Sequence, residues 1–155
     1  MAYASKAGGT EGLAEMVGGD LRELGHEVDV VPAGDVQEVD SYGAVVIGGA
    51  LYIFRWHRDA RRFVKRFRVA LRGRPVWLFS SGPLDDSART KDIPPVRFVR
   101  KAVTMVGAKG HATFGGRLTQ AARSNNKALS VGDWRDPEHV KEWTETIAKE
   151  LAEAS

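Results

Sequence analysis

The sequence has no cysteine among its 155 residues. Disulfides, thiolate catalysis and cysteine-ligated zinc or iron–sulfur clusters are therefore excluded, and any redox chemistry requires a bound cofactor. No apolar run approaches the ~20 residues that span a bilayer, and no secretory leader opens the chain. A Walker loop and a GxGxxG dinucleotide fingerprint are both missing. We expect a soluble, cytoplasmic protein without a metal site.

Acidic residues are almost missing between Arg55 and Arg74, where Asp59 stands alone against nine cations. Four apolar residues of this stretch share one helical stripe, so the cations are expected on the outer face of a helix. A solvated surface explains such a face, as does attraction to an anionic membrane surface, to an acidic redox partner or to substrate carboxylates. No nucleic-acid reading motif is present, so that partner is not expected. The cations are Arg55, Arg58, Arg61, Arg62, Lys65, Arg66, Arg68, Arg72 and Arg74; the apolar residues are Ala60, Phe63, Val64 and Phe67.

What is present is an alternation of strand and helix patterns along one domain, residues 1–155. Each connection is long enough to hold a helix, which predicts a doubly wound α/β fold with a five-stranded parallel sheet. Asp136 and Pro137 mark the start of the last helix, and Gly25 marks the end of the first. The predicted strands are 1–4, 28–31, 44–47, 76–79 and 111–114, and the predicted helices are 11–24, 56–71, 95–106 and one that begins after Asp136.

A small, glycine-rich loop joins the first strand to the first helix. Ser5 and Thr10 supply hydroxyls, and Gly8 and Gly9 let backbone N–H groups approach a ligand at the start of the helix. This pattern suits a phosphate, while a plain strand-to-helix turn with Thr10 as the N-cap is the alternative. Two further loops follow strand ends, at residues 48–55 and 80–84. Because ligands bind beyond the carboxyl ends of parallel strands, all three loops are candidates.

Three motifs carry a family resemblance: YASKAGGT at residues 3–10, VVIGGALYIFRWH at 45–57 and WLFSSGPL at 77–84. Together they resemble the flavodoxin-like proteins, and are most similar to the branch related to menaquinone-dependent protoporphyrinogen dehydrogenase. The resemblance covers essentially the whole chain and implies strand order 2-1-3-4-5 and an FMN cofactor. It implies that the first loop holds the phosphate and that the other two flank the isoalloxazine. The residues so implicated are Ser5, Lys6, Ala7, Gly8, Gly9, Thr10, Ala50, Leu51, Tyr52, Ile53, Ser80, Ser81, Gly82, Pro83 and Leu84.

Three residues near the second loop invite separate interpretations. The family often places an aromatic ring against the flavin here, which makes Tyr52 the candidate; packing on the neighbouring helix is its alternative. Trp56 is in phase with the apolar stripe of the helix and is expected in the core. His57 is suited to proton donation at neutral pH, but a surface histidine near a helix start is the simpler interpretation.

Several departures from the family pattern leave the function open. The first strand has only residues 1–4, which predicts an upstream start or a truncated strand; Ala7 replaces a hydroxyl residue, and Phe54 replaces glycine. The loop at 115–135 is short and polar, unlike the long basic loop of the dehydrogenase branch. We expect an FMN-binding oxidoreductase that passes electrons from a porphyrinogen to a quinone, with peripheral contact at the inner membrane face as one interpretation. A flavodoxin-type electron carrier, and a binding domain that has lost FMN, are the alternatives.

Overall fold

A twisted sheet with helices on both faces forms the molecule, and the computed structural model describes residues 1–5, 8–120 and 131–154. Five parallel strands run in the order β2-β1-β3-β5-β6, which matches the predicted topology once the short antiparallel β4 beside β3 is set apart. The strands are β1 (Ala2–Ala4), β2 (Val31–Pro32), β3 (Val45–Tyr52), β4 (Arg55–Trp56), β5 (Val76–Ser81) and β6 (Gly110–Phe114).

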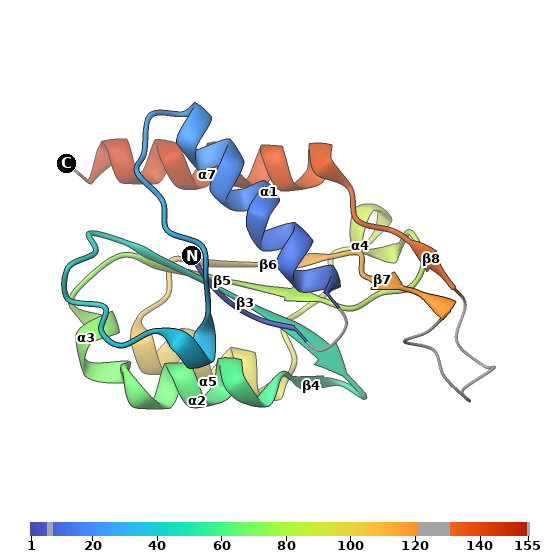
Figure 1. Ribbon diagram of the computed structural model, residues 1–155, viewed down its shortest axis with the longest axis horizontal. Coiled ribbons are helices and arrows are strands. Elements are labelled where there is room, and N and C mark those ends of the chain that lie inside the picture. Colours follow the sequence, from blue (N-terminus) through green and yellow to red (C-terminus); the bar gives the residue numbers. More distant parts are fainter. Residues whose placement is uncertain (6–7, 121–130, 155) are drawn as a thin grey trace.

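Two layers of helices cover the sheet (Figure 1). Helices α1 (Gly9–Glu23) and α7 (Pro137–Glu153) lie together on one face. The other face carries α2 (Arg58–Arg66), α3 (Arg68–Arg72) and α5 (Arg97–Val106). The short elements are η1 (Ala33–Asp35), α4 (Ser87–Thr90) and the antiparallel pair β7 (Arg117–Leu118) and β8 (Gly132–Asp133).

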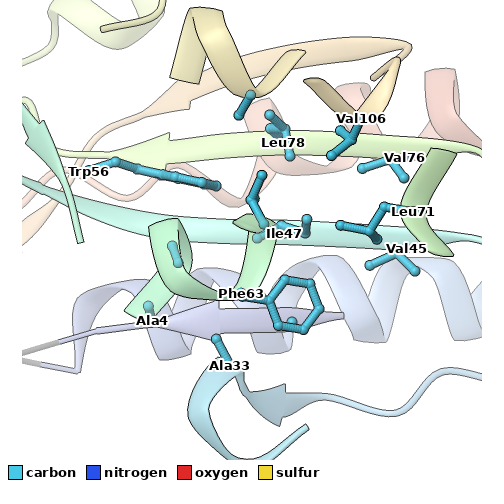
Figure 2. Close-up of a cluster of buried hydrophobic side chains, with 14 of the residues drawn as sticks. Ala4, Ala33, Val45, Ile47, Trp56, Phe63, Leu71, Val76, Leu78 and Val106 are labelled. Carbon is cyan, nitrogen blue, oxygen red and sulfur yellow. The ribbon is translucent and has the colours of Figure 1, made fainter. Parts of the chain in front are cut away.

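Alternate residues of the central strands supply two separate cores, because successive strand side chains point to opposite faces. Val45, Ile47 and Leu78 pack beneath α2, α3 and α5, together with Trp56 (Figure 2). On the opposite face Val46, Trp77 and Phe79 pack beneath α1 and α7 with Phe114, Val140 and Ile147. The last helix begins where predicted: the Asp136 carboxylate accepts hydrogen bonds from the N–H groups of Glu138 and His139, and Pro137 is its first residue.

Several predicted element boundaries were wrong. The strand at 28–31 is reduced to Val31–Pro32, and β3 continues through Gly48 and Gly49 to Tyr52. Only glycine fits at these two strand positions, because the Phe79 ring covers Gly48 and the Trp56 indole covers Gly49, leaving no space for a Cβ.

The segment predicted as one helix from Trp56 also differs. Trp56 belongs to β4, and the helix starts at Arg58 after the half-buried His57, whose Nδ1 accepts a hydrogen bond from the Asp59 N–H at 3.0 Å. Trp56 is nevertheless 1% exposed, so its predicted place in the core is confirmed. The helix is interrupted at Phe67 between α2 and α3, although Phe67 still donates a hydrogen bond to Phe63 and accepts one from Leu71.

Candidate functional site

The first loop gives way to α1 through a glycine in the left-handed region. Gly8 has φ +81°, and its N–H donates to the Ser5 hydroxyl at 3.0 Å, which ties Ser5 to the start of the helix. Gly8 is the N-cap and Thr10 lies inside the helix, so the alternative with Thr10 as the cap was wrong. By helix geometry the first N–H groups of α1 have no acceptor within the helix and suit an anion. Lys6 and Ala7 lie outside the described residues.

A buried hydroxyl pair joins the first loop to the third. Thr10 Oγ1 lies 3.0 Å from Ser81 Oγ, and both side chains are at most 5% exposed. Because Ser81 is the last residue of β5, this contact holds the N-terminal turn of α1 against the end of a central strand. Ser80 points to the opposite face, where its hydroxyl lies 3.2 Å from His111 Nε2. Burial lowers the pKa of His111 to about 4, so its ring is neutral at pH 7.

The second loop is a tight hairpin between β3 and β4. Ala50, Leu51 and Tyr52 belong to β3 itself, and Ile53 and Phe54 form the turn. Ile53 has φ +48° and Phe54 has φ +59°, a conformation that costs side chains other than glycine of order 1–3 kcal/mol each. Their exposed fractions are 74% and 87%, so the turn presents two large apolar side chains to solvent.

The third loop touches the hairpin. Gly82 lies so close to Leu51 that a Cβ on the glycine would be 2.9 Å from the Leu51 Cβ. The Gly82 N–H donates to the Phe114 carbonyl at 3.2 Å, and the Pro83 carbonyl accepts from the Gly116 N–H at 2.9 Å. Pro83 and Leu84 are half-buried. The three predicted loops therefore meet at the carboxyl edge of the sheet, through Thr10 with Ser81 and Leu51 with Gly82.

A fourth segment, after β6, was missed by sequence reasoning. Gly116 packs on the Gly82 carbonyl, and Arg117 lies against Gly9, with its Cβ 3.4 Å from where a Cβ on that glycine would stand. The Trp134 N–H donates to the Gly116 carbonyl at 2.9 Å, which fixes the segment from its other side. The available signal was the pair Gly115–Gly116 directly after a predicted strand, the same strand-end position as the other loops.

Two cavities lie near the first strand, and only one of them involves the loops. A cavity of about 390 Å³ is lined by Ser5 and Gly8 and also by the carboxylate residues Glu11, Asp35 and Asp59. Tyr3 lies in its wall, where its hydroxyl donates to Glu11 at 3.2 Å; burial and this neighbouring carboxylate raise the pKa of Tyr3. A second cavity of about 250 Å³, between Met1, Tyr42 and Phe63, contains no predicted site residue.

Comparison with known proteins gives a family and a fold. A family model described as "Flavodoxin domain" matches residues 1–124, and no curated protein sequence matches the chain. The chain is similar in structure to oxidised flavodoxin 2 from Bacillus cereus, with 22% identity, TM-score 0.67 and 96% of each chain covered. It is also similar to two-electron reduced Megasphaera elsdenii flavodoxin, with 19% identity, TM-score 0.66 and 96% of each chain covered.

A larger protein contains the same fold. Rubredoxin oxygen:oxidoreductase from Desulfovibrio gigas matches with 15% identity and TM-score 0.67 over 97% of this chain, but only 35% of its own length. Because these identities are low, the solved structures show the fold alone. The family membership is shown by the family model, which covers residues 1–124. The chain belongs to the flavodoxin domain family.

Proposed function

We propose that the chain binds FMN at the carboxyl edge of its sheet and acts as a single-domain electron carrier. Proteins of the flavodoxin family are FMN-binding flavoproteins. The observation that carries the proposal here is the buried contact between Thr10 and Ser81, which joins the start of α1 to the end of β5 where the predicted loops meet. When bound, FMN supplies the electron transfer, and the protein supplies binding and orientation.

The residues at the start of α1 fit the phosphate of FMN. Gly8 turns the backbone so that the first N–H groups of the helix are presented together, and Ser5, Thr10 and Ser81 add hydroxyls. These donors are neutral, and helix ends of this kind bind phosphate without a cation. Ser5 and Gly8 also line the neighbouring cavity, whose three acidic residues repel a dianion. We therefore assign the phosphate to the start of α1 itself, near Thr10 and Ser81, and not to the interior of that cavity.

The hairpin and the third loop would flank the isoalloxazine ring. Tyr52 is 65% exposed at the end of β3, and an aromatic ring of this kind can stack on a flavin. Leu51 and Gly82 hold the two loops together at their base, which sets the separation of their tips. The third loop, residues 82–84, would hold the ring through those backbone groups that are not already paired with Phe114 and Gly116. In this arrangement the protein orients the ring and excludes water from one face.

The extent of the structural match supports a carrier. The match to oxidised flavodoxin 2 of Bacillus cereus covers 96% of both chains, so the fold carries no large addition relative to that protein. The net charge of +3 argued against a carrier, because carriers of this family are typically acidic. However, the basic residues concentrate on α2, α3 and α5, while the loop edge carries acidic residues together with a few basic ones. The acidic residues are Glu11, Asp35, Asp59, Asp85 and Asp86, and the basic ones include Arg55 and Arg117.

The more specific activity, protoporphyrinogen oxidation with a quinone as acceptor, remains a prediction from the sequence resemblance. It is tested with FMN-loaded protein, a porphyrinogen and menaquinone under anaerobic conditions. Quinone reduction that depends on both the porphyrinogen and the protein would establish the dehydrogenase. Reversible reduction of the bound flavin without quinone turnover is the result expected of a carrier.

The decisive experiment is titration of the apo protein with FMN and with riboflavin. We expect FMN to bind more tightly than riboflavin. Thr10→Val should weaken FMN binding by roughly 1–3 kcal/mol, about 5- to 150-fold, because a hydroxyl at the phosphate site is lost. Riboflavin affinity should hardly change. Thr104→Val, an exposed change on α5, is the control. Equal affinities for the two flavins, or no binding of either, would contradict the proposal.

A further inference from the structure

The two helical layers carry opposite charge. Helices α2, α3 and α5 together hold ten basic side chains and one acidic side chain. Helices α1 and α7, on the other face of the sheet, hold nine acidic and three basic side chains. Figure 1 shows the sheet between the two layers. The molecule therefore has a strong charge dipole perpendicular to its sheet, which the net charge of +3 conceals.

The cations of the basic layer face solvent without acidic partners. Among the residues that the structure describes, none of the exposed cations of α2, α3 and α5 forms an ion pair, and the layer's one acid, Asp59, is half-buried. The charged groups of some of them make contacts within the layer: Arg72 Nε donates to the Met105 carbonyl at 2.7 Å, and the Lys65 ammonium lies 5.6 Å from the centre of the Phe98 ring. The layer is thus an ordered cationic surface. Its exposed members are Arg58, Arg62, Lys65, Arg66, Arg68, Arg72, Arg97, Arg100 and Lys101.

Exposed apolar side chains accompany this cationic surface. Phe54 is 87% exposed, Val69 80% and Ile53 74%, the three highest values for large hydrophobic residues in the described part of the chain. Val69 lies in α3 between Arg68 and Arg72. Phe54 and Ile53 form the β3–β4 turn, beyond the N-terminal end of α2 (Figure 1). Apolar groups among cations are typical of surfaces that bind the interface of a membrane.

We propose that the cationic surface of α2, α3 and α5 docks the protein on an anionic lipid surface. A membrane surface is wide enough to contact all three neighbouring helices at once. Each basic residue near its negative headgroups strengthens binding. The acidic layer on the opposite face is repelled, so a single orientation is favoured. Val69 and Phe54 then enter the headgroup region at the two ends of the surface. An acidic protein partner would contact only part of this surface, so it would not account for cations on all three helices. It would also not account for the acidic layer on the opposite face.

In this orientation the β3–β4 turn lies at the lipid surface while the start of α1 stays on the solvent side of the sheet (Figure 1). The proposal rests on surface charge and exposure, so it applies to the protein with or without flavin. Vesicle binding is therefore measured with and without added FMN, so that a failure of lipid docking can be told apart from a failure of FMN binding.

The experiment is flotation of the purified protein with vesicles of phosphatidylcholine alone or with 30% phosphatidylglycerol. We expect binding only to the anionic vesicles, weakening steeply as salt rises. Arg62→Gln with Arg68→Gln should weaken binding roughly 30-fold, from about fivefold for each cation. Lys141→Gln with Lys149→Gln on α7 is the matched control, because it changes the net charge equally on the acidic layer and should alter binding less than about twofold.

A second variant tests the apolar contribution. Val69→Ser leaves every charge in place and should weaken vesicle binding by roughly threefold to tenfold, since part of a valine side chain leaves the headgroup region. Absence of binding to anionic vesicles, or equal losses in the α7 control, would overturn the proposal. Binding to polyglutamate or to duplex DNA without vesicle binding would overturn it in favour of an acidic macromolecule.

Discussion

The two faces of the sheet differ both inside and outside. Beneath α1 and α7 the core contains a connected cluster of aromatic rings: the centre of the Phe79 ring lies 5.5 Å from that of Phe114 and 6.0 Å from that of Trp143, and the Phe114 and His139 ring centres are 4.9 Å apart. Beneath α2, α3 and α5 the core is mainly aliphatic, and Trp56 is its largest residue. The outer surfaces are acidic and basic respectively. The candidate site lies where the faces meet, with Thr10 supplied by one and the β3–β4 hairpin by the other.

Truncation of adjacent residues in β5 should show the largest difference between the faces. Phe79→Ala removes the ring at the centre of the aromatic cluster and is expected to cost about 3–5 kcal/mol of unfolding free energy, because the remaining rings cannot close the cavity. Leu78→Ala, on the aliphatic face, should cost about 2–4 kcal/mol. Urea unfolding measures both, with Val69→Ala as an exposed control. A larger loss for Leu78→Ala would contradict the comparison.

Adding a methyl group at the centre of β3 tests the same two cores by overpacking. A Cβ on Gly48 would collide with the Phe79 ring, and one on Gly49 with the Trp56 indole, so each alanine should cost about 1–3 kcal/mol. Phe79→Leu should partly relieve Gly48→Ala and leave the cost of Gly49→Ala unchanged. A double-mutant cycle measures this coupling, expected at about 0.5 kcal/mol or more for the Gly48 pair. Equal coupling for both glycines would show that the faces are not independent.

These glycines illustrate where sequence reasoning ended. The start of α7 and the parallel sheet could be predicted because local signals fix them, namely Asp136 with Pro137 for the helix and long crossovers for the sheet. The strand order was implied by the family resemblance and not by local signals. The continuation of β3 through Gly48 and Gly49 could not, because the rings that cover these glycines come from residues 79 and 56.

The candidate site divides in the same way. Its loops were found because they follow strand ends. The contact between Thr10 and Ser81, 71 positions apart, and the packing of Gly116 on Gly82 depend on tertiary structure and carry no local signal. The predicted cofactor-binding residues Lys6 and Ala7 lie outside the described residues and remain predictions.

Each face also holds a histidine whose burial lowers its pKa, and the effect is larger on the basic side. His111, beside Ser80, has its pKa lowered to about 4 by burial. The unfolded chain therefore binds more protons than the folded one between about pH 6.5 and pH 4, so stability falls as pH falls through that window. We expect a loss of about 2 kcal/mol between pH 7 and pH 5 from this residue.

The variant His111→Gln should flatten the pH dependence of stability in that window, and the exposed His26→Gln should leave it unchanged. His139, on the aromatic face, has its pKa lowered mainly by burial and by Arg89, and His139→Gln should produce a smaller change. Unfolding free energies at pH 5, 6 and 7 decide the matter. A titration of the His111 ring near its ordinary pKa, followed by NMR, would remove the basis of the expectation.

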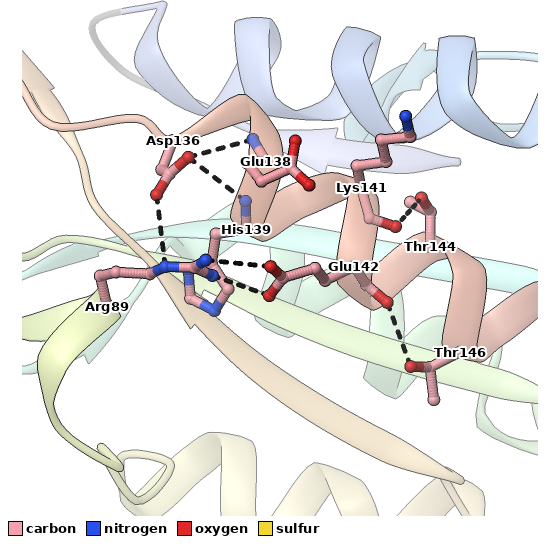
Figure 3. Close-up of polar contacts among 8 residues, drawn as sticks. All are labelled: Arg89, Asp136, Glu138, His139, Lys141, Glu142, Thr144 and Thr146. Carbon is pink, nitrogen blue, oxygen red and sulfur yellow. Dashed lines mark hydrogen bonds and ion pairs between the residues drawn. The ribbon is translucent and has the colours of Figure 1, made fainter.

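Smaller effects come from the helix caps of the two layers. Asp136 Oδ1 accepts from two backbone N–H groups of α7, at 3.0 and 3.3 Å (Figure 3), whereas His57 Nδ1 accepts from one on α2. Asp136→Ala should therefore cost about 1 kcal/mol, and His57→Ala less, because one N–H is easily rehydrated. Asp136→Asn, which keeps an acceptor, is the control and should recover most of the loss. Equal costs for the two caps would contradict this ranking.

The smallest expected effect concerns cations at the surface. Arg89 binds Glu142 through two hydrogen bonds of 2.8 and 2.9 Å and approaches Asp136 at 3.6 Å (Figure 3), so it lies in an acidic setting. Removing it as Arg89→Met should lower stability slightly and only at low salt, since these exposed charges are screened by ions.

Arg68 stands among cations, and no ion pair involves it in the described part of the chain. Arg68→Met relieves repulsion, so the same chemical change should raise stability slightly, again only at low salt. Thermal unfolding at low and high ionic strength measures both variants. Because the two substitutions are identical in side chain and in charge, opposite signs at low salt can arise only from the surrounding field. Shifts of the same sign would mean that local packing, and not the acidic or basic character of the layer, governs these positions.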